Sequence, residues 1–151
     1  MFDAEALLNA TTTNANSTEY EMLPEGTEFV GQIQRLPGKP AMHKFEKDGN
    51  TTWYFDMNLE ASGPAVKAAT GRDKTNVKYS IGLDITPMGT LASGKGENVR
   101  LGILREAAGQ NADGMPFKLT DVFGKAVRFT VKHRMGEDGR KFQDVAKVLP
   151  L

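Results

Sequence analysis

One segment of the chain matches a motif that binds phosphate groups. Residues 89–96 follow the G-x-x-x-x-G-K pattern of a phosphate-binding loop, with Lys95 as the lysine. Gly96 occupies the position where such a loop has the Ser or Thr that holds magnesium, and the flanking pattern predicts antiparallel strands rather than a βαβ unit. We therefore interpret the segment as a flexible approach to a helix, from which Lys95 could still contact a phosphate. Nucleotide hydrolysis is the weaker interpretation.

Histidines and carboxylates provide no second candidate for catalysis. His43 and His133 are the two histidines of the chain, far apart in sequence and without a cluster of further metal ligands around either one. Asp56, Glu60 and Asp84 fall on strand faces, where exposed carboxylates usually meet lysines or water. No nucleophile stands beside a base. We expect neither an enzyme nor a metal or other cofactor.

Basic and aromatic residues together fit a different chemistry. A single nucleic-acid strand binds to a positive groove that follows its phosphates and to aromatic rings on which its bases stack, each stack contributing about 1–3 kcal/mol. The candidate nucleic-acid-binding residues are Arg35, Lys39, Lys44, Phe45, Trp53, Tyr54, Lys78, Arg128, Lys132, Arg134, Arg140 and Lys141. Trp53 shares its phase with Phe55 and Met57, which favours burial over stacking. The alternative is that the basic residues only keep a sheet face soluble.

Five segments have the period of strands and one has the period of a helix. Apolar and polar residues alternate along 52–61, 76–86 and 127–132, which is typical of half-buried strands. A further strand is expected at 27–36, and residues 124–149 read as a closing hairpin that turns at 137–139. Residues 97–108 have helical spacing, with Val99, Ile103, Leu104, Ala107 and Ala108 on the expected buried face and Gly109 beyond the end.

The order of these elements predicts a mainly β fold. Three strands, one helix and two strands (βββαββ) is the order of a five-stranded antiparallel OB-fold barrel. In that barrel the first strand must bend to serve both parts of the sheet, and Gly31 would permit this bend. Residues 42–51 form either a long basic loop or a small hairpin extension. A sandwich or an open five-stranded sheet is the alternative architecture.

Composition divides the chain into an acidic start and a basic body. Six of the 19 acidic residues precede the first basic residue, Arg35, so 13 acidic and 19 basic residues follow. We expect a flexible acidic arm at 1–22 and an OB-fold domain at 23–151. The chain has no cysteine, no signal-like start and no apolar run long enough to span a membrane, so we expect a cytoplasmic protein.

Several sequence segments together resemble a known family. They are FDAEALLNA, LPEGTEFVGQI, WYFDMNLE, NVRLGILREAAG, FGKAVRFTV and GRKFQDVAKVLP. These segments, which span nearly the whole chain, are similar to those of phage-encoded single-stranded-DNA-binding proteins with an OB-fold. Many single-strand binders end in an acidic tail that recruits replication enzymes, whereas this chain ends in Val148, Leu149, Pro150 and Leu151.

The resemblance implies a non-enzymatic, largely sequence-independent binder of single-stranded DNA. Such a protein would act in phage DNA replication or recombination in the host cytoplasm. In place of the missing tail, the acidic arm would contact replication or recombination proteins. The number of subunits stays open, with a homo-oligomer among the alternatives. The other reading is an OB-fold module that binds a protein, for instance a recombinase or polymerase subunit, without direct DNA binding.

Overall fold

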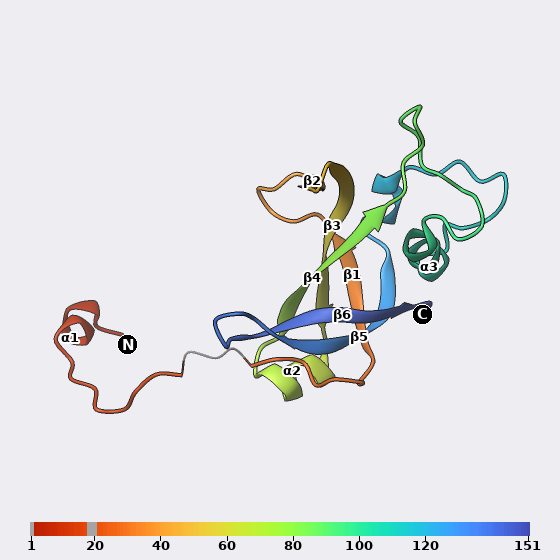
Figure 1. Cartoon of the computed structure of the whole chain (residues 1–151). Coiled ribbons are helices and arrows are strands. Elements are labelled where there is room, and N and C mark those ends of the chain that lie inside the picture. Colours follow the sequence, from red (N-terminus) through yellow and green to blue (C-terminus); the bar gives the residue numbers. More distant parts are fainter. Residues whose placement is uncertain (1, 18–20) are drawn as a thin grey trace.

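Six antiparallel strands form the body of the protein (Figure 1). The structure is a computed structural model, and it describes residues 2–17 and 21–151. The strands are β1 (Phe29–Gln34), β2 (Met42–Lys47), β3 (Asn50–Ser62), β4 (Lys74–Leu83), β5 (Ala126–Met135) and β6 (Lys141–Leu149). The prediction of a mainly β fold is confirmed.

The 13-residue strand β3 is the centre of the sheet. On one edge its first half pairs with β2 and its second half pairs with β1, while β4 pairs with its other edge from Trp53 to Ser62. β1 and β2 are therefore two segments of the same edge. Beyond β1 the sheet continues through β5 to β6. Residues 42–51 thus form a hairpin extension, which makes six strands rather than the five expected.

Gly31 lies where β1 joins the two parts of the sheet. It is paired with Ala61 on β3 and with Val127 on β5, so β1 serves both parts as predicted. A Cβ atom at residue 31 would come 2.8 Å from Cε1 of Phe129, which is closer than real Cβ atoms approach. Glycine is required here because the fully buried Phe129 ring occupies the space that a side chain would need.

The inner face of the curved sheet forms the core. Most residues that the alternation predicted as apolar are buried, among them Phe55, Leu59, Ile81 and Phe129. Trp53 and Ile85 have the same phase but are 37% and 40% exposed, because they lie at or beyond the end of the β3–β4 pairing, so the expected burial of Trp53 was wrong. Leu23 is the first buried residue of the described chain. It is held by the two strands of the last hairpin, because its N–H donates to Gln143 Oε1 at 3.1 Å and its carbonyl contacts His133 Nε2 at 2.7 Å.

Within residues 2–17 and 21–151, four short helical segments accompany the sheet. They are α1 (Ala4–Leu8), α2 (Pro64–Thr70), α3 (Val99–Ala107) and the 3₁₀ turn η1 (Leu119–Val122). α2 was missed because its small residues read as a connection, although Pro64 begins it and Gly71, with φ of 73°, ends it. In Figure 1, α1 lies well apart from the sheet. Residues 1 and 18–20 of the predicted acidic arm lie outside the described residues.

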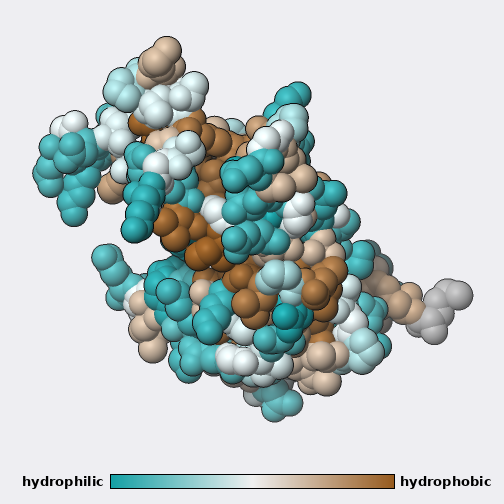
Figure 2. All heavy atoms as spheres, turned by 90° about the vertical axis from the view of Figure 1, so that its right-hand side faces the viewer, coloured by the Kyte–Doolittle hydropathy of each residue, from teal (hydrophilic) through white to brown (hydrophobic). Residues whose placement is uncertain are grey.

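The helix α3 confirms the predicted helix, and its buried face matches the expected face in part. Leu101, Leu104 and Ala107 pack inward, whereas Val99 and Ile103 are about half exposed, at 53% and 47%. Figure 2 shows the side of the molecule that carries α3, where hydrophobic surface forms a band between hydrophilic regions. Leu104 and Ala107 thus confirm part of the expected face, and the expectation was wrong for Val99 and Ile103 because the buried face also includes Leu101.

The sheet is not closed into a barrel. Among the described residues no strand pairing joins β4 to β6, although both strands contribute side chains to the same pocket. Among those residues, too, no helix has the length and apolar character needed to cross a membrane.

Candidate nucleic-acid interface

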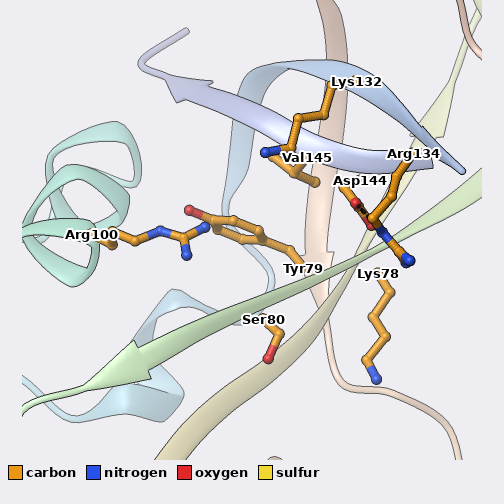
Figure 3. Close-up of a pocket in the computed structure, with 8 residues that line it drawn as sticks. All are labelled: Lys78, Tyr79, Ser80, Arg100, Lys132, Arg134, Asp144 and Val145. Atoms are coloured by element: carbon orange, nitrogen blue, oxygen red, sulfur yellow. Dashed lines mark hydrogen bonds and ion pairs between the residues drawn. The ribbon is translucent and has the colours of Figure 1, made fainter. Parts of the chain in front are cut away.

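A pocket of about 340 Å³ lies between β4 and the β5–β6 hairpin, beside the start of α3 (Figure 3). It is called the cationic pocket below. Its lining is Lys78, Tyr79 and Ser80 from β4, Arg100 from α3, Lys132 and Arg134 from β5, and Asp144 and Val145 from β6. Four positive side chains and one carboxylate therefore meet at a place where the sheet is open.

Strand alternation explains how these charges come together. Lys132 follows the buried Val131, and Lys78 lies between the buried residues Val77 and Tyr79, so both lysines leave the core face. Arg134 Nε is 2.8 Å from Asp144 Oδ2, so this ion pair neutralises one of the four cations. Within the described residues, no carboxylate is within ion-pair distance of Lys78, Lys132 or Arg100. The cationic pocket therefore keeps an excess of positive charge.

Tyr79 and Arg100 form one side of the cationic pocket. The guanidinium carbon of Arg100 lies 5.7 Å from the centroid of the Tyr79 ring, and the phenol oxygen points toward Arg100 in Figure 3. Burial raises the pKa of Tyr79 above 10.0, and the positive charge of Arg100 and its hydrogen bond to the phenol oppose that rise. The phenol is consequently neutral at physiological pH.

A second pocket of about 230 Å³ adjoins the first. Its lining is Leu36, Lys39, Pro40, His43, Asp56 and Lys78, and it is called the His43 pocket below. Lys78 lines both pockets, so they border each other along β4. Together they follow the polar face of β3 and β4, from the loop after β1 to the β5–β6 hairpin.

Three polar side chains of the His43 region, Asp56, Ser80 and His43, are joined by hydrogen bonds. Asp56 is 5% exposed; its carboxylate accepts a hydrogen bond of 2.5 Å from Ser80 Oγ and pairs with His43 Nδ1. The imidazole of His43 stacks on the Tyr54 ring with centroids 5.0 Å apart and planes 10° apart. The expectation that Asp56 is an ordinary exposed carboxylate was therefore wrong. Its cross-strand neighbours, Ser80 and the histidine, bury it.

Five of the candidate residues lie on or beside this double pocket. Lys39 and Lys78 line the His43 pocket, Lys78, Lys132 and Arg134 line the cationic pocket, and Tyr54 stacks on His43. Phe45 is a further neighbour, 54% exposed. It lies two residues from His43 on β2, and its strand partner Thr52 lies two residues from Tyr54. Strand alternation therefore puts Phe45 on the same face as His43 and Tyr54.

The other candidates lie elsewhere. Trp53 is opposite Lys44 and Leu83 on the reverse face of the β2–β3 hairpin, at the end of the core face, and is 37% exposed. Arg35 lies over the Phe123 ring at 4.9 Å. Arg128 is at the far end of β5, where its guanidinium is 2.7 Å from Glu28. The structure does not bring these side chains to either pocket.

Arg140 is the last residue of the turn between β5 and β6, and Lys141 is the first residue of β6. Arg140 Nε is 3.5 Å from Asp138 Oδ2, and neither residue lines a pocket. They lie near Arg134 in the sequence, at the outer end of the hairpin that supplies Lys132 and Arg134. A ligand longer than the two pockets could reach them.

Sequence reasoning missed Arg100, His43 and Asp144 as members of the site. Arg100 comes from a helix that reaches the sheet only through the tertiary fold, and no local pattern marks it. The His43 contact depends on the register of β2 against β3, which places His43 opposite Tyr54. If the strand register of the hairpin at 42–51 had been assigned from the sequence, it would have placed His43 next to Tyr54 and so in the site.

The glycine-rich segment 89–96 is not arranged like a phosphate-binding loop. The N–H of Gly94 donates to Glu97 Oε1 at 3.0 Å, so this backbone donor is already occupied. The buried Asn98 closes the whole segment, because its side chain accepts from Asp84 N and donates to the carbonyls of Asp84 and Ala92. In the part of the chain that is described, no group of three His, Cys, Asp or Glu residues is placed to hold a metal ion.

Comparison with known proteins adds no relative to this description. No family model matches the chain, and no curated protein sequence matches it either.

Proposed function

We propose that the protein binds single-stranded DNA, largely independently of sequence, along the cationic pocket and the His43 pocket. The observation that carries this proposal is the position of Lys78, which borders both pockets and so links the cations of the hairpin to the rings of Tyr54 and His43. The proposed setting is phage DNA replication or recombination in the host cytoplasm.

The strand pairings support an OB-type architecture. β1 with β3, β3 with β4, β1 with β5, and β5 with β6 are the pairings expected for a five-stranded OB-fold, with β2 as an extension of its first loop. OB-folds are partly open, and they bind oligonucleotides on the face of their second and third strands between two loops. In this chain that face is β3 with β4, which is the face that both pockets follow.

The proposed mechanism needs no covalent step. Lys78, Arg100 and Lys132 replace counterions on the phosphates, and Tyr54 and Phe45 provide rings for the bases. Phosphates and rings are common to all nucleotides, so the binding does not read sequence. The affinity then falls with salt, and the log-log slope is near −0.7 for each phosphate contacted.

The arm provides the second candidate function, which is contact with a replication or recombination protein. In α1 the carboxylate of Asp3 accepts from the N–H groups of Glu5 and Ala6, and Phe2, Leu7 and Leu8 are 61–76% exposed. A short acidic segment with exposed apolar side chains fits a protein groove better than DNA. We propose this contact as an addition to DNA binding, and a homo-oligomer is one form the assembly can take.

Titration with oligo-dT at two salt concentrations tests the proposal. Binding that weakens as salt rises is the expected result, and fluorescence from Trp53 also reports whether a base approaches the β2–β3 hairpin. Absence of binding at low salt would refute the proposal. Tight capture of a purified replication or recombination protein by the same preparation would then favour the protein-binding alternative.

A further inference from the structure

We propose that His43 is a phosphate ligand whose contribution depends on pH. The ligand is a backbone phosphate of the bound strand in the His43 pocket, separate from the phosphates held in the cationic pocket. This inference rests on the proposed function, because it names one contact of the same bound strand.

The tautomer of His43 follows from its partner. An ionised carboxylate only accepts hydrogen bonds, so the Nδ1 atom in contact with Asp56 must carry a hydrogen. Ser80 donates to the other oxygen of the same carboxylate, which holds Asp56 in place. Nε2 is consequently the ring nitrogen left for a ligand, and among the described residues it has no protein partner.

The charge state of the ring decides what Nε2 can bind. In the neutral ring Nε2 presents a lone pair, which repels a phosphate oxygen. In the protonated ring it presents an N–H and a positive charge, and such a donor forms a charge-assisted hydrogen bond to phosphate. Histidine ordinarily changes between these states from pH 5 to 8.

The surroundings fit a phosphate next to a protonated ring. Asp56 on β3 is the negative group in contact with His43, Tyr54 on β3 stacks on it, and Lys39 and Lys78 are the positive groups that line the same pocket. The side chain of His43 is 47% exposed, whereas that of Asp56 is 6% exposed. A ligand can therefore reach the imidazole but not the carboxylate that orients it.

Affinity for a dT oligonucleotide, measured from pH 5.5 to 8.5 at constant ionic strength, tests the inference. We expect the wild-type protein to bind roughly tenfold more tightly at pH 5.5 than at pH 8.5. Its salt slope should be steeper by about 0.7 at the lower pH. His43→Gln should remove most of both differences, because the test compares affinities at the two pH values within one protein and does not depend on the absolute affinity of the variant.

His133→Gln is the matched control. His133 is the other histidine, and its Nε2 contacts the carbonyl of Leu23 outside both pockets. This variant should keep the wild-type pH dependence. If it loses the pH dependence as His43→Gln does, the assignment to His43 is overturned.

The outcomes separate this inference from the proposed function. Wild-type affinity that does not change with pH overturns the role of His43 while leaving single-stranded-DNA binding intact. Failure to bind at every pH overturns the proposed function itself. If His43→Gln does not fold, a pH titration of the two histidines of the wild-type protein, followed by NMR with and without dT, tests the inference instead. Bound dT should shift the midpoint of His43 to higher pH and leave that of His133 in place, and an unmoved His43 refutes the inference.

Discussion

Tyr54 lies directly opposite Gly82 across β3 and β4, and a Cβ atom added at Gly82 would come 3.6 Å from Tyr54 Cε1. That distance is ordinary van der Waals contact, so a Cβ atom fits at residue 82. The absence of a side chain leaves the flank of the Tyr54 ring open on the proposed binding face.

Gly82→Val should therefore weaken DNA binding without weakening the fold. Valine would cover the flank of Tyr54 and narrow the approach of a base, and we expect the affinity for dT to fall by about tenfold, the loss of one stacked base. Valine also favours strands over glycine, so the free energy of unfolding should stay equal or rise by up to about 1 kcal/mol. Oligonucleotide titration and denaturant unfolding measure the two effects. Unchanged affinity would remove Tyr54 from the interface.

Lys132→Ala should lower both the affinity and its salt dependence. Lys132 lines the cationic pocket without a carboxylate partner among the described residues, so its loss should reduce the magnitude of the salt slope by about 0.7. Lys125→Ala is the matched control, because Lys125 directly precedes β5 and lines neither pocket. Titrations at several salt concentrations compare the two variants. Equal losses would mean that overall charge, rather than the pocket, determines binding.

Gly31→Ala should destabilise the protein through Phe129. The added methyl group overlaps the Phe129 ring, and we expect the free energy of unfolding to fall by about 1–3 kcal/mol. A smaller side chain at 129 gives the methyl group room. The double variant with Phe129→Leu should therefore lose less than the two single variants together, by at least about 0.5 kcal/mol. Urea unfolding of the four proteins gives the coupling, and strict additivity would contradict this explanation of Gly31.

Asn98→Gly should loosen the segment between β4 and α3. Asn98 has a φ of 49°, which glycine adopts freely, so this change removes the side-chain hydrogen bonds to Asp84 and Ala92 without adding backbone strain. We expect a loss of about 2–3 kcal/mol in the free energy of unfolding. Amide exchange should become faster at residues 85–97, measured by mass spectrometry. Unchanged exchange there would show that other contacts hold the segment.

The strands could be predicted because their alternation is an intrinsic property of the sequence. Most residues with the apolar phase, such as Phe55 and Phe129, are buried in the structure. Alternation did not reveal that Asp56 and Asn58, on the polar face of β3, are buried as well. A helix was predicted at 97–108 because its apolar residues have helical spacing, and α3 spans Val99–Ala107. α2 could not be recognised from period, because its seven residues include only two buried ones, Val66 and Thr70.

The site was less predictable because it depends on pairing between distant segments. Lys78, Lys132 and Arg134 could be chosen from strand phase alone, and the fold brings them to one pocket. Strand phase could not reveal that Arg128 forms an ion pair with Glu28. Arg128 lies near the start of β5, whereas Lys132 and Arg134 lie toward its end. Arg100 joins the pocket only because α3 packs beside β4 and β6, which no local pattern encodes.

Leu23 fixes the point at which the N-terminal arm leaves the body. Its backbone bonds to His133 and Gln143 attach the arm to the hairpin that also carries Lys132 and Arg134. A segment of about 20 residues reaches at most about 70 Å. A protein bound to α1 would thus stay within that reach of the cationic pocket, which raises its effective concentration there. Delivery to the bound strand would then be an intramolecular event rather than a search through solution.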